Sequence, residues 1–525
     1  MTAVGTCEVP LARTVSPRSG NSSGPEDAAS GGRGSAVWTL AAAVAIGLWV
    51  TDFAAAPAVS DRVVLRSIAV TVEYLALMAF IGDRYGRSLR QFQLGPWYLL
   101  SSAVTMGLAS IAWRNPQSGF LATIDRSSVA HALAIVGLAA PLWAIGYVVG
   151  PGVVALRLGH RLAAVATSER DGRGGGMCRP NAVWVLAGVS VLARIAQIAL
   201  GQFGYLADPS KAVSGSSSYA QILVETGSLG LAALAIASVE LARFGGARRR
   251  MVFLVLLGTE IGFGLLSGMK GGFAYTLLAV CLSFTVARGR LPLRWLLGAA
   301  AVFMLVVVPF NASYRDIVRK HGRTNLSASA AVAAAPQVIV QTVDGGNGGN
   351  DSGKSSSESV LSSTVIDRVR AVDSLAAVVQ KTPNMVPYRS AFELVTDPVL
   401  GMVPRALWPG KPVRTAGYTF NQEYYDTPAN LYSSAAISPQ ADLFRHGGLL
   451  VLLLGSALMG ALYRFVDETL YPARDLRLTA LYVSLFTLLL TSETTVTDLL
   501  VSLPIKVAIV VAACRFAYFR PPARV

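Results

Sequence analysis

Long apolar runs recur along most of the chain and are separated by short polar stretches. A run of about 20 apolar residues is long enough to cross the hydrocarbon core of a bilayer as a helix. The pattern predicts about twelve such helices, at residues 36–58, 63–81, 95–113, 129–150, 181–200, 219–241, 251–268, 272–287, 295–310, 447–463, 478–491 and 499–516. We therefore expect an all-α, polytopic membrane bundle.

Composition agrees with a membrane protein. Of the 525 residues, 53% are hydrophobic and only 14% are charged, whereas a soluble globular chain carries about 25% charged residues. The four cysteines and four histidines are scattered without metal-ligand spacing, so we predict no metal and no cofactor. The chain also lacks an Asp-x-Asp pair, a phosphate-binding loop and a serine nucleophile elbow, which argues against a nucleotide sugar or ATP as substrate.

The positive charge has a regular distribution. Lysine and arginine exceed aspartate and glutamate by 45 − 30 = 15. Arginine-rich loops follow the second, fourth, sixth, eighth and tenth apolar runs, and the loops between them hold few cations. Because cytoplasmic loops are enriched in Lys and Arg, this alternation predicts a multi-pass protein of the cytoplasmic membrane with both termini in the cytoplasm. The net charge then reflects topology, and we predict no nucleic-acid partner.

The same alternation divides the chain. Residues 1–35 are rich in Ser, Gly, Pro and Arg and are predicted to be a disordered cytoplasmic tail. The first nine spans occupy 36–310, a large extracytoplasmic loop occupies 311–446, and the last three spans with a short tail occupy 447–525. Within the loop, 324–358 has low complexity and is predicted to be flexible. Apolar residues at helical spacing near 365–379 predict an amphipathic helix lying on the membrane or on the bundle.

One stretch of the loop, residues 404–412, reads Pro-Arg-Ala-Leu-Trp-Pro-Gly-Lys-Pro. Its prolines stiffen the backbone and would hold Arg405 and Lys411 in a rigid setting, with Arg414 just beyond. Rigid cations suit a diphosphate, and Trp408 suits either a sugar ring or the membrane interface. The alternative is a surface loop whose cations are merely solvated.

A second group of candidates lies where the loop enters the tenth span. Asp442 and His446 are four residues apart and would share a helix face. A carboxylate beside an imidazole is a plausible acid–base pair, and Arg445 adds a cation. The alternative is a helix start, at which Asp442 favours the positive end of the helix dipole.

Three further cations stand in unusual places. Arg315 follows the ninth span on the predicted outer side, Lys270 lies in an outer turn, and Arg194 falls within the fifth span. Charge inside a membrane is a functional candidate by default. The competing interpretations are headgroup anchoring for Arg315 and, for the other two, an ion pair with Glu225, Glu240 or Glu260.

The Pro-Arg-x-x-Trp-Pro-x-Lys-Pro run, in a large external loop before the last spans, resembles the O-antigen and oligosaccharide repeat-unit polymerases, the Wzy-type family. The Ser-Gly-x-Lys-Gly turn at 267–271 and the Tyr-Arg sequence after the ninth span are similar to that family's pattern. At the entry to the tenth span the family tends to have a Glu before Asn-Phe-Gly, whereas this chain has Asp442 and then Arg-His-Gly. The resemblance covers residues 180–500.

The resemblance implies an activity. Such enzymes join oligosaccharide repeat units carried on polyprenyl diphosphate at the outer face of the cytoplasmic membrane, without a nucleotide sugar. Cations would stabilise the departing diphosphate, and a base would take the hydroxyl proton. Expected partners are the lipid-linked oligosaccharide, membrane lipid, and a chain-length regulator or flippase. The alternatives are an O-antigen-ligase-like or other lipid-phosphate-dependent glycosyltransferase, a flippase for the same lipid, and a scaffold in a cell-envelope complex.

Overall fold

The computed structural model describes residues 25–55, 57–115, 117, 119–167, 179, 181–204, 220–290, 293–303, 307, 369–403, 408, 410–411, 416–428 and 434–518. All regular secondary structure in these ranges is helical. The chain is therefore an all-α protein, as its sequence predicts. The first helix begins at Pro25, within the segment for which a tail was predicted.

The helices of the first part of the chain are α1 (Pro25–Ala55), α2 (Val59–Tyr85), α3 (Leu94–Ser102), α4 (Arg126–Val149), α5 (Gly152–Thr167), α6 (Ala182–Ala199), α8 (Ala220–Gly227), α9 (Leu229–Phe244), α10 (Ala247–Leu266), α11 (Lys270–Arg288) and α12 (Leu293–Val302). The later helices are α16 (Val372–Lys381), α17 (Glu393–Met402), α18 (Ala416–Tyr425), α19 (Pro439–Arg445), α20 (Gly448–Thr469), α21 (Thr479–Leu489) and α22 (Val496–Tyr518). Short 3₁₀ or π segments are η1 (Leu89–Gln91), η2 (Ala103–Gly107), η3 (Leu108–Arg114), η4 (Gly119–Thr123) and η7 (Leu476–Leu478).

Nine helical segments among the described residues are long and apolar enough to cross a membrane. They are Ala36–Ala55, Val59–Tyr85, Leu94–Arg114, Arg126–Val149, Ala182–Ala199, Gln221–Phe244, Gly271–Arg288, Gly448–Thr469 and Val496–Tyr518. Each overlaps a run that the sequence singles out. The other three predicted runs correspond to α10, α12 and α21, which are shorter or more charged helices. The total of about twelve spans and the extracytoplasmic loop remain predictions.

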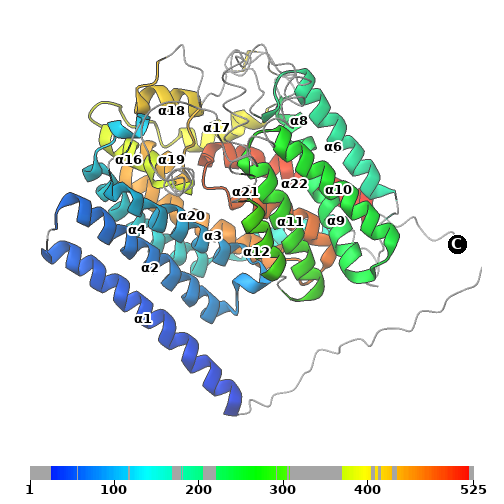
Figure 1. The fold of residues 1–525 in the computed structure, drawn as a ribbon, viewed down its shortest axis with the longest axis horizontal. Coiled ribbons are helices and arrows are strands. Elements are labelled where there is room, and N and C mark those ends of the chain that lie inside the picture. Colours follow the sequence, from blue (N-terminus) through cyan, green and yellow to red (C-terminus); the bar gives the residue numbers. More distant parts are fainter. Residues whose placement is uncertain are drawn as a thin grey trace, which may run out of the picture.

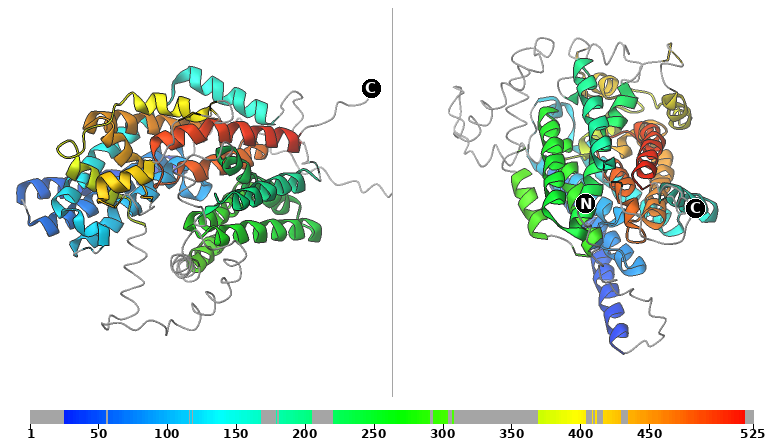
Figure 2. Two further views of the ribbon diagram at one scale, coloured as in Figure 1. Left: turned by 90° about the horizontal axis from the view of Figure 1, so that it is seen from above. Right: turned by 90° about the vertical axis from the view of Figure 1, so that its right-hand side faces the viewer.

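The spans form two neighbouring groups that the last helices join (Figures 1 and 2). In one group α1 packs on α2, α2 on α4, and α4 on α20. In the other, α6, α9, α10 and α11 pack on one another. Helices α21 and α22 contact α9, and α21 also contacts α20. The C-terminal segment thus joins parts of the bundle that are far apart in sequence.

Glycines allow α4 and α20 to approach each other closely. A Cβ atom at Gly146 would overlap the backbone of Ala457, and one at Gly460 would overlap the carbonyl of Trp143. Small residues at such crossings let membrane helices pack backbone against backbone. The α4–α20 pair is accordingly the central contact of the first group.

The third span is irregular in its second half. After α3 the chain continues as the π segment η2 and the 3₁₀ segment η3. Here the backbone carbonyl of Thr105 accepts a hydrogen bond from the backbone N–H of Ala371 at 3.0 Å, and Trp113 Nε1 donates to Asp373 Oδ1 at 2.8 Å. Departures from regular helix free backbone and side-chain groups to bond elsewhere, and in this protein they hold the start of α16.

Helix α16 lies in the stretch for which an amphipathic helix was predicted. It begins at Val372, and the residues Val372–Val378 are all buried, including Asp373 and Ser374. It packs against α4, α18 and α19. The helix is thus enclosed by the protein on both its apolar and its polar faces. The helix does pack on the bundle, as predicted. It does not lie at the surface, because Trp113 and Arg370 cover its charged side.

Candidate functional site

The structure describes the side chains of only some of the candidate residues predicted from the sequence. Arg315, Arg405 and Arg414 lie outside the described residues, and their roles stay predictions. Lys270 is the first residue of α11, and only its backbone is described. The remaining candidates fall into two places, one around α19 and one after α17.

Asp442 connects two helices that are distant in sequence. Its buried carboxylate Oδ1 accepts a hydrogen bond from Arg445 Nε at 2.9 Å and lies 2.8 Å from Nη2. Its Oδ2 accepts from the backbone N–H groups of Val496 at 2.8 Å and Thr497 at 3.4 Å. These are donors at the first turn of α22, which lack partners inside their own helix. Asp442 lies in the first turn of α19, in line with the helix-start alternative, and it also caps α22.

Arg445 is a buried cation whose side chain is 2% exposed. Two of its nitrogens face Asp442, and its guanidinium carbon lies 5.9 Å from the centre of the Phe420 ring. The third nitrogen, Nη1, has no hydrogen-bond partner among the described residues. A buried donor without a partner costs free energy, and such a group in a folded protein calls for an explanation.

His446 has one engaged and one open ring nitrogen. Nδ1 lies 2.7 Å from the backbone oxygen of Asp442. A carbonyl can only accept, so Nδ1 carries the proton and Nε2 is an acceptor in the neutral ring. Nε2 lies 3.9 Å from Glu393 Oε2 in the first turn of α17. An imidazole nitrogen that faces a carboxylate is an arrangement found in acid–base sites.

Further polar residues surround this group, and the sequence did not single them out. Arg389 binds Glu423 through Nη2 at 3.2 Å from both carboxylate oxygens. Its backbone N–H donates to the carbonyl of Arg445 at 2.8 Å. Lys381 Nζ lies 2.7 Å from Asp426 Oδ2. These contacts bring α16, α17, α18 and α19 together at the end of the bundle where α20 and α22 begin.

Tyr424 belongs to the same group. Its hydroxyl is 3.0 Å from Thr382 Oγ1. Burial raises the pKa of Tyr424, and the hydrogen bond with Thr382 and the charge of Arg445 oppose that rise. The phenol therefore stays protonated near neutral pH and can donate a hydrogen bond.

Lys411 and Trp408 lie just beyond α17. Lys411 Nζ donates to the carbonyl oxygens of Gly401 at 2.7 Å and Val403 at 2.8 Å. These carbonyls belong to the C-terminal end of α17, so Lys411 caps that helix. Trp408 is partly exposed. Binding of diphosphate by Lys411 and of sugar by Trp408 stays a prediction.

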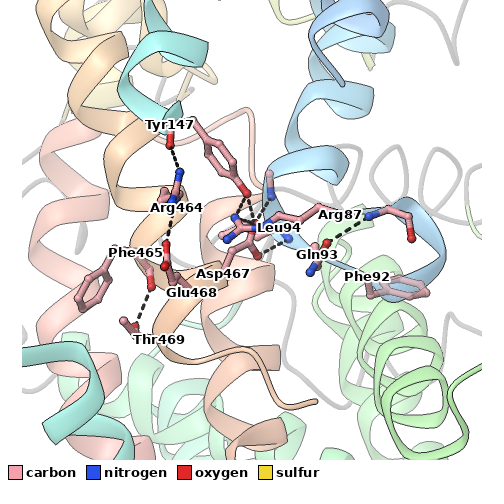
Figure 3. Close-up of polar contacts among 12 residues, drawn as sticks. Arg87, Phe92, Gln93, Leu94, Tyr147, Arg464, Phe465, Asp467, Glu468 and Thr469 are labelled. Carbon is pink, nitrogen blue, oxygen red and sulfur yellow. Dashed lines mark hydrogen bonds and ion pairs between the residues drawn. The ribbon is translucent and has the colours of Figure 1, made fainter. Parts of the chain in front are cut away.

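A second polar cluster lies at the opposite end of α20 and was missed by the sequence analysis (Figure 3). Asp467 is buried, and its two oxygens accept hydrogen bonds from the backbone of Leu94 at 2.7 Å and of Gly95 at 2.9 Å. The hydroxyls of Tyr147 and Tyr482 each donate to it at 2.8 Å. Asp467 caps α3 and joins it to α4, α20 and α21.

Two of the charges within the candidate spans, those of Arg194 and Lys506, form ion pairs. Arg194 Nη1 and Nη2 each donate to Glu260 at 2.8 Å. Lys506 Nζ lies 3.1 Å from Glu225 Oε2. The ion-pair interpretation of Arg194 is thereby confirmed. These pairs hold α6 against α10 and α22 against α8.

The nine candidate spans support one class, a multi-pass membrane protein. Residues 197–494 match the model of a domain of unknown function (DUF8712). This match covers more than half of the chain, so the protein belongs to that family. The matched region includes α19, Asp442 and Asp467, but it excludes their partners in α22, α3 and α4. No curated protein and no solved structure matches the chain.

Proposed function

We propose that this protein is a glycosyltransferase that polymerises polyprenyl-diphosphate-linked oligosaccharide repeat units at the outer face of the cytoplasmic membrane. In this proposal about twelve spans cross the membrane, both termini are cytoplasmic and residues 311–446 are external. The polar group around α19 then lies at the outer mouth of the bundle, where a lipid-linked substrate can reach it. The Wzy-type resemblance of residues 404–412 supports the same assignment.

One observation carries the proposal. Arg445, whose Nη1 has no hydrogen-bond partner among the described residues, directly precedes His446, whose Nε2 lies 3.9 Å from the carboxylate of Glu393. A cation suits a departing diphosphate, and an open imidazole nitrogen suits a hydroxyl proton. Transfer of a glycosyl group from a diphosphate needs both.

The proposed reaction runs as follows. A hydroxyl oxygen of the acceptor unit attacks the anomeric carbon of the donor chain, and the bond from that carbon to the phosphate oxygen breaks. The diphosphate leaves with the electron pair and is stabilised by Arg445 and Arg405. The hydroxyl proton passes to His446 Nε2, and Glu393 stabilises the imidazolium. Asp442 holds Arg445 through its carboxylate and the His446 ring through its backbone carbonyl.

A flippase for the same lipid is the second candidate, because charges lie within the candidate spans. The structure describes two ion pairs among these charges, Arg194 with Glu260 and Lys506 with Glu225, and in each pair the charges neutralise each other. A transporter site near the membrane midplane would instead present polar groups to its substrate. The pairing therefore favours the enzyme.

Substitution of His446 tests the proposal. In His446→Asn the amide nitrogen can still donate to the Asp442 carbonyl, but the nitrogen corresponding to Nε2 is lost. We expect polymer to disappear from gels and lipid-linked single units to accumulate. Arg405→Ala should do the same, with Arg405→Lys a partial rescue, since lysine keeps the charge but loses the bidentate fork.

The matched control is Glu468→Gln, which removes a carboxylate at the far end of α20 and should leave polymer length unchanged. If His446→Asn and Arg405→Ala both make normal polymer at normal expression, the polymerase assignment is wrong. Loss of lipid-linked units from the outer leaflet would point to the flippase instead.

A further inference from the structure

Helix α17 has three distinct faces. Pro398 and Gly401 are buried, and the helix packs against α22. Glu393 directs its carboxylate toward His446. The third face is apolar and exposed: Phe392, Val395, Val399 and Met402, at the i, i+3, i+7 and i+10 spacing of one helix face, are 70%, 61%, 59% and 38% exposed.

The position of α17 relates this apolar face to the membrane. Its first turn lies beside His446, which lies two residues before the start of α20 at Gly448. Tyr388, just before α17, stands over Gly448, the first residue of that span. The helix then lies beside α22, another candidate span (Figures 1 and 2). Ten residues span about 15 Å, so α17 is too short to cross the roughly 30 Å hydrocarbon core.

The last carbonyls of α17 accept hydrogen bonds from a side chain. A helix leaves its last carbonyls without internal partners, and in lipid each unsatisfied backbone group is costly. Lys411 Nζ donates to two of these carbonyls, Gly401 at 2.7 Å and Val403 at 2.8 Å. Partly exposed aromatic rings, Tyr388 and Trp408, flank the two ends of the helix. Such rings favour the boundary between lipid and water.

We propose that α17 is embedded in one leaflet of the bilayer, with its apolar face against lipid acyl chains and its Glu393 face toward the polar group around His446. The helix forms a wall between lipid and that group. In this arrangement Lys411 keeps the buried helix end satisfied. The inference concerns location and does not depend on the polymerase assignment.

Spin labelling of the full-length chain tests the location. Val395→Cys and Val399→Cys are made in a background carrying Cys7→Ser and Cys178→Ser, in which Cys281 and Cys514 are buried. The labelled protein is reconstituted in phosphatidylcholine–phosphatidylglycerol vesicles. Collision rates with oxygen, which concentrates in lipid, and with a water-soluble nickel chelate are then measured.

Two positions calibrate the result. Leu454→Cys reports an exposed site in the middle of α20, and Asp426→Cys reports an exposed site outside the spans. Labels at Val395 and Val399 should show an oxygen-to-nickel ratio closer to that at Leu454. A ratio closer to that at Asp426 would overturn the proposal, because the apolar face would then lie in water.

A second comparison tests the role of Lys411. Lys411→Met removes the donor to the two carbonyls, and Lys411→Arg retains a charged donor. With the label at Val399, we expect Lys411→Met to increase nitroxide mobility and nickel accessibility, and Lys411→Arg to preserve the original spectrum. An unchanged spectrum in Lys411→Met would show that the helix end does not need this cap.

Discussion

Replacement of Asp467 by asparagine should destabilise the fold more than any other single charge deletion at that end of α20. Oδ1 of Asp467 accepts from Leu94 and Tyr482, and Oδ2 accepts from Gly95 and Tyr147. Asp467→Asn keeps one oxygen and replaces the other with an NH₂ group. That group would face donors, so two hydrogen bonds to the carboxylate are lost, while Leu94 N–H and the Tyr482 hydroxyl keep their other partners.

The expected magnitude follows from these contacts. A hydrogen bond to a charged group contributes about 1.5–3 kcal/mol, and two are lost. Arg87, whose Nη1 lies 3.5 Å from Oδ2, also loses its counter-charge. Removing one partner of a buried ion pair costs about 3–5 kcal/mol. Because these terms overlap, we expect the free energy of unfolding to fall by about 3–5 kcal/mol.

The neighbouring residue provides the control. Glu468 pairs with Arg464 at 2.7 Å, and its side chain is 28% exposed. The pair is partly exposed to solvent, and surface pairs contribute about 0–1 kcal/mol, so Glu468→Gln should change stability by about 1 kcal/mol at most. Both variants are compared by reversible unfolding in mixed micelles with increasing dodecyl sulfate. Equal losses in the two variants would refute the assignment of Asp467 as the cap of α3.

The remaining predictions concern packing, charge and topology. Gly460→Ala should lower the free energy of unfolding by about 1–3 kcal/mol, since its Cβ would overlap the α4 backbone. Gly47 has open space around it, so Gly47→Ala should not destabilise the protein, and equal unfolding midpoints for the two variants would contradict this prediction. Arg194→Gln should cost about 3–5 kcal/mol, and adding Glu260→Gln should recover much of it in a double-mutant cycle. Ser355→Cys should react with an impermeant thiol reagent on intact cells; protection until lysis would reverse the predicted topology.

The sequence alone determined much of the architecture. Apolar runs are a local property, and a bilayer requires each spanning backbone to satisfy its own hydrogen bonds as a helix. Nine of the predicted runs therefore reappear as candidate spans. The ion pair of Arg194 was also predictable in kind, because a charge within a span needs a partner. The sequence could not predict that the partner of Arg194 is Glu260 and not Glu225 or Glu240.

Tertiary structure decided what the polar residues do. Asp442 caps a helix that begins 54 residues later, and Asp467 caps one that lies 373 residues earlier. Lys411, predicted as a phosphate ligand from its rigid surroundings, donates to the end of α17. No local pattern encodes these partners. They depend on which helix ends the fold brings together, because an unpaired helix terminus takes whichever donor or acceptor lies nearest in space.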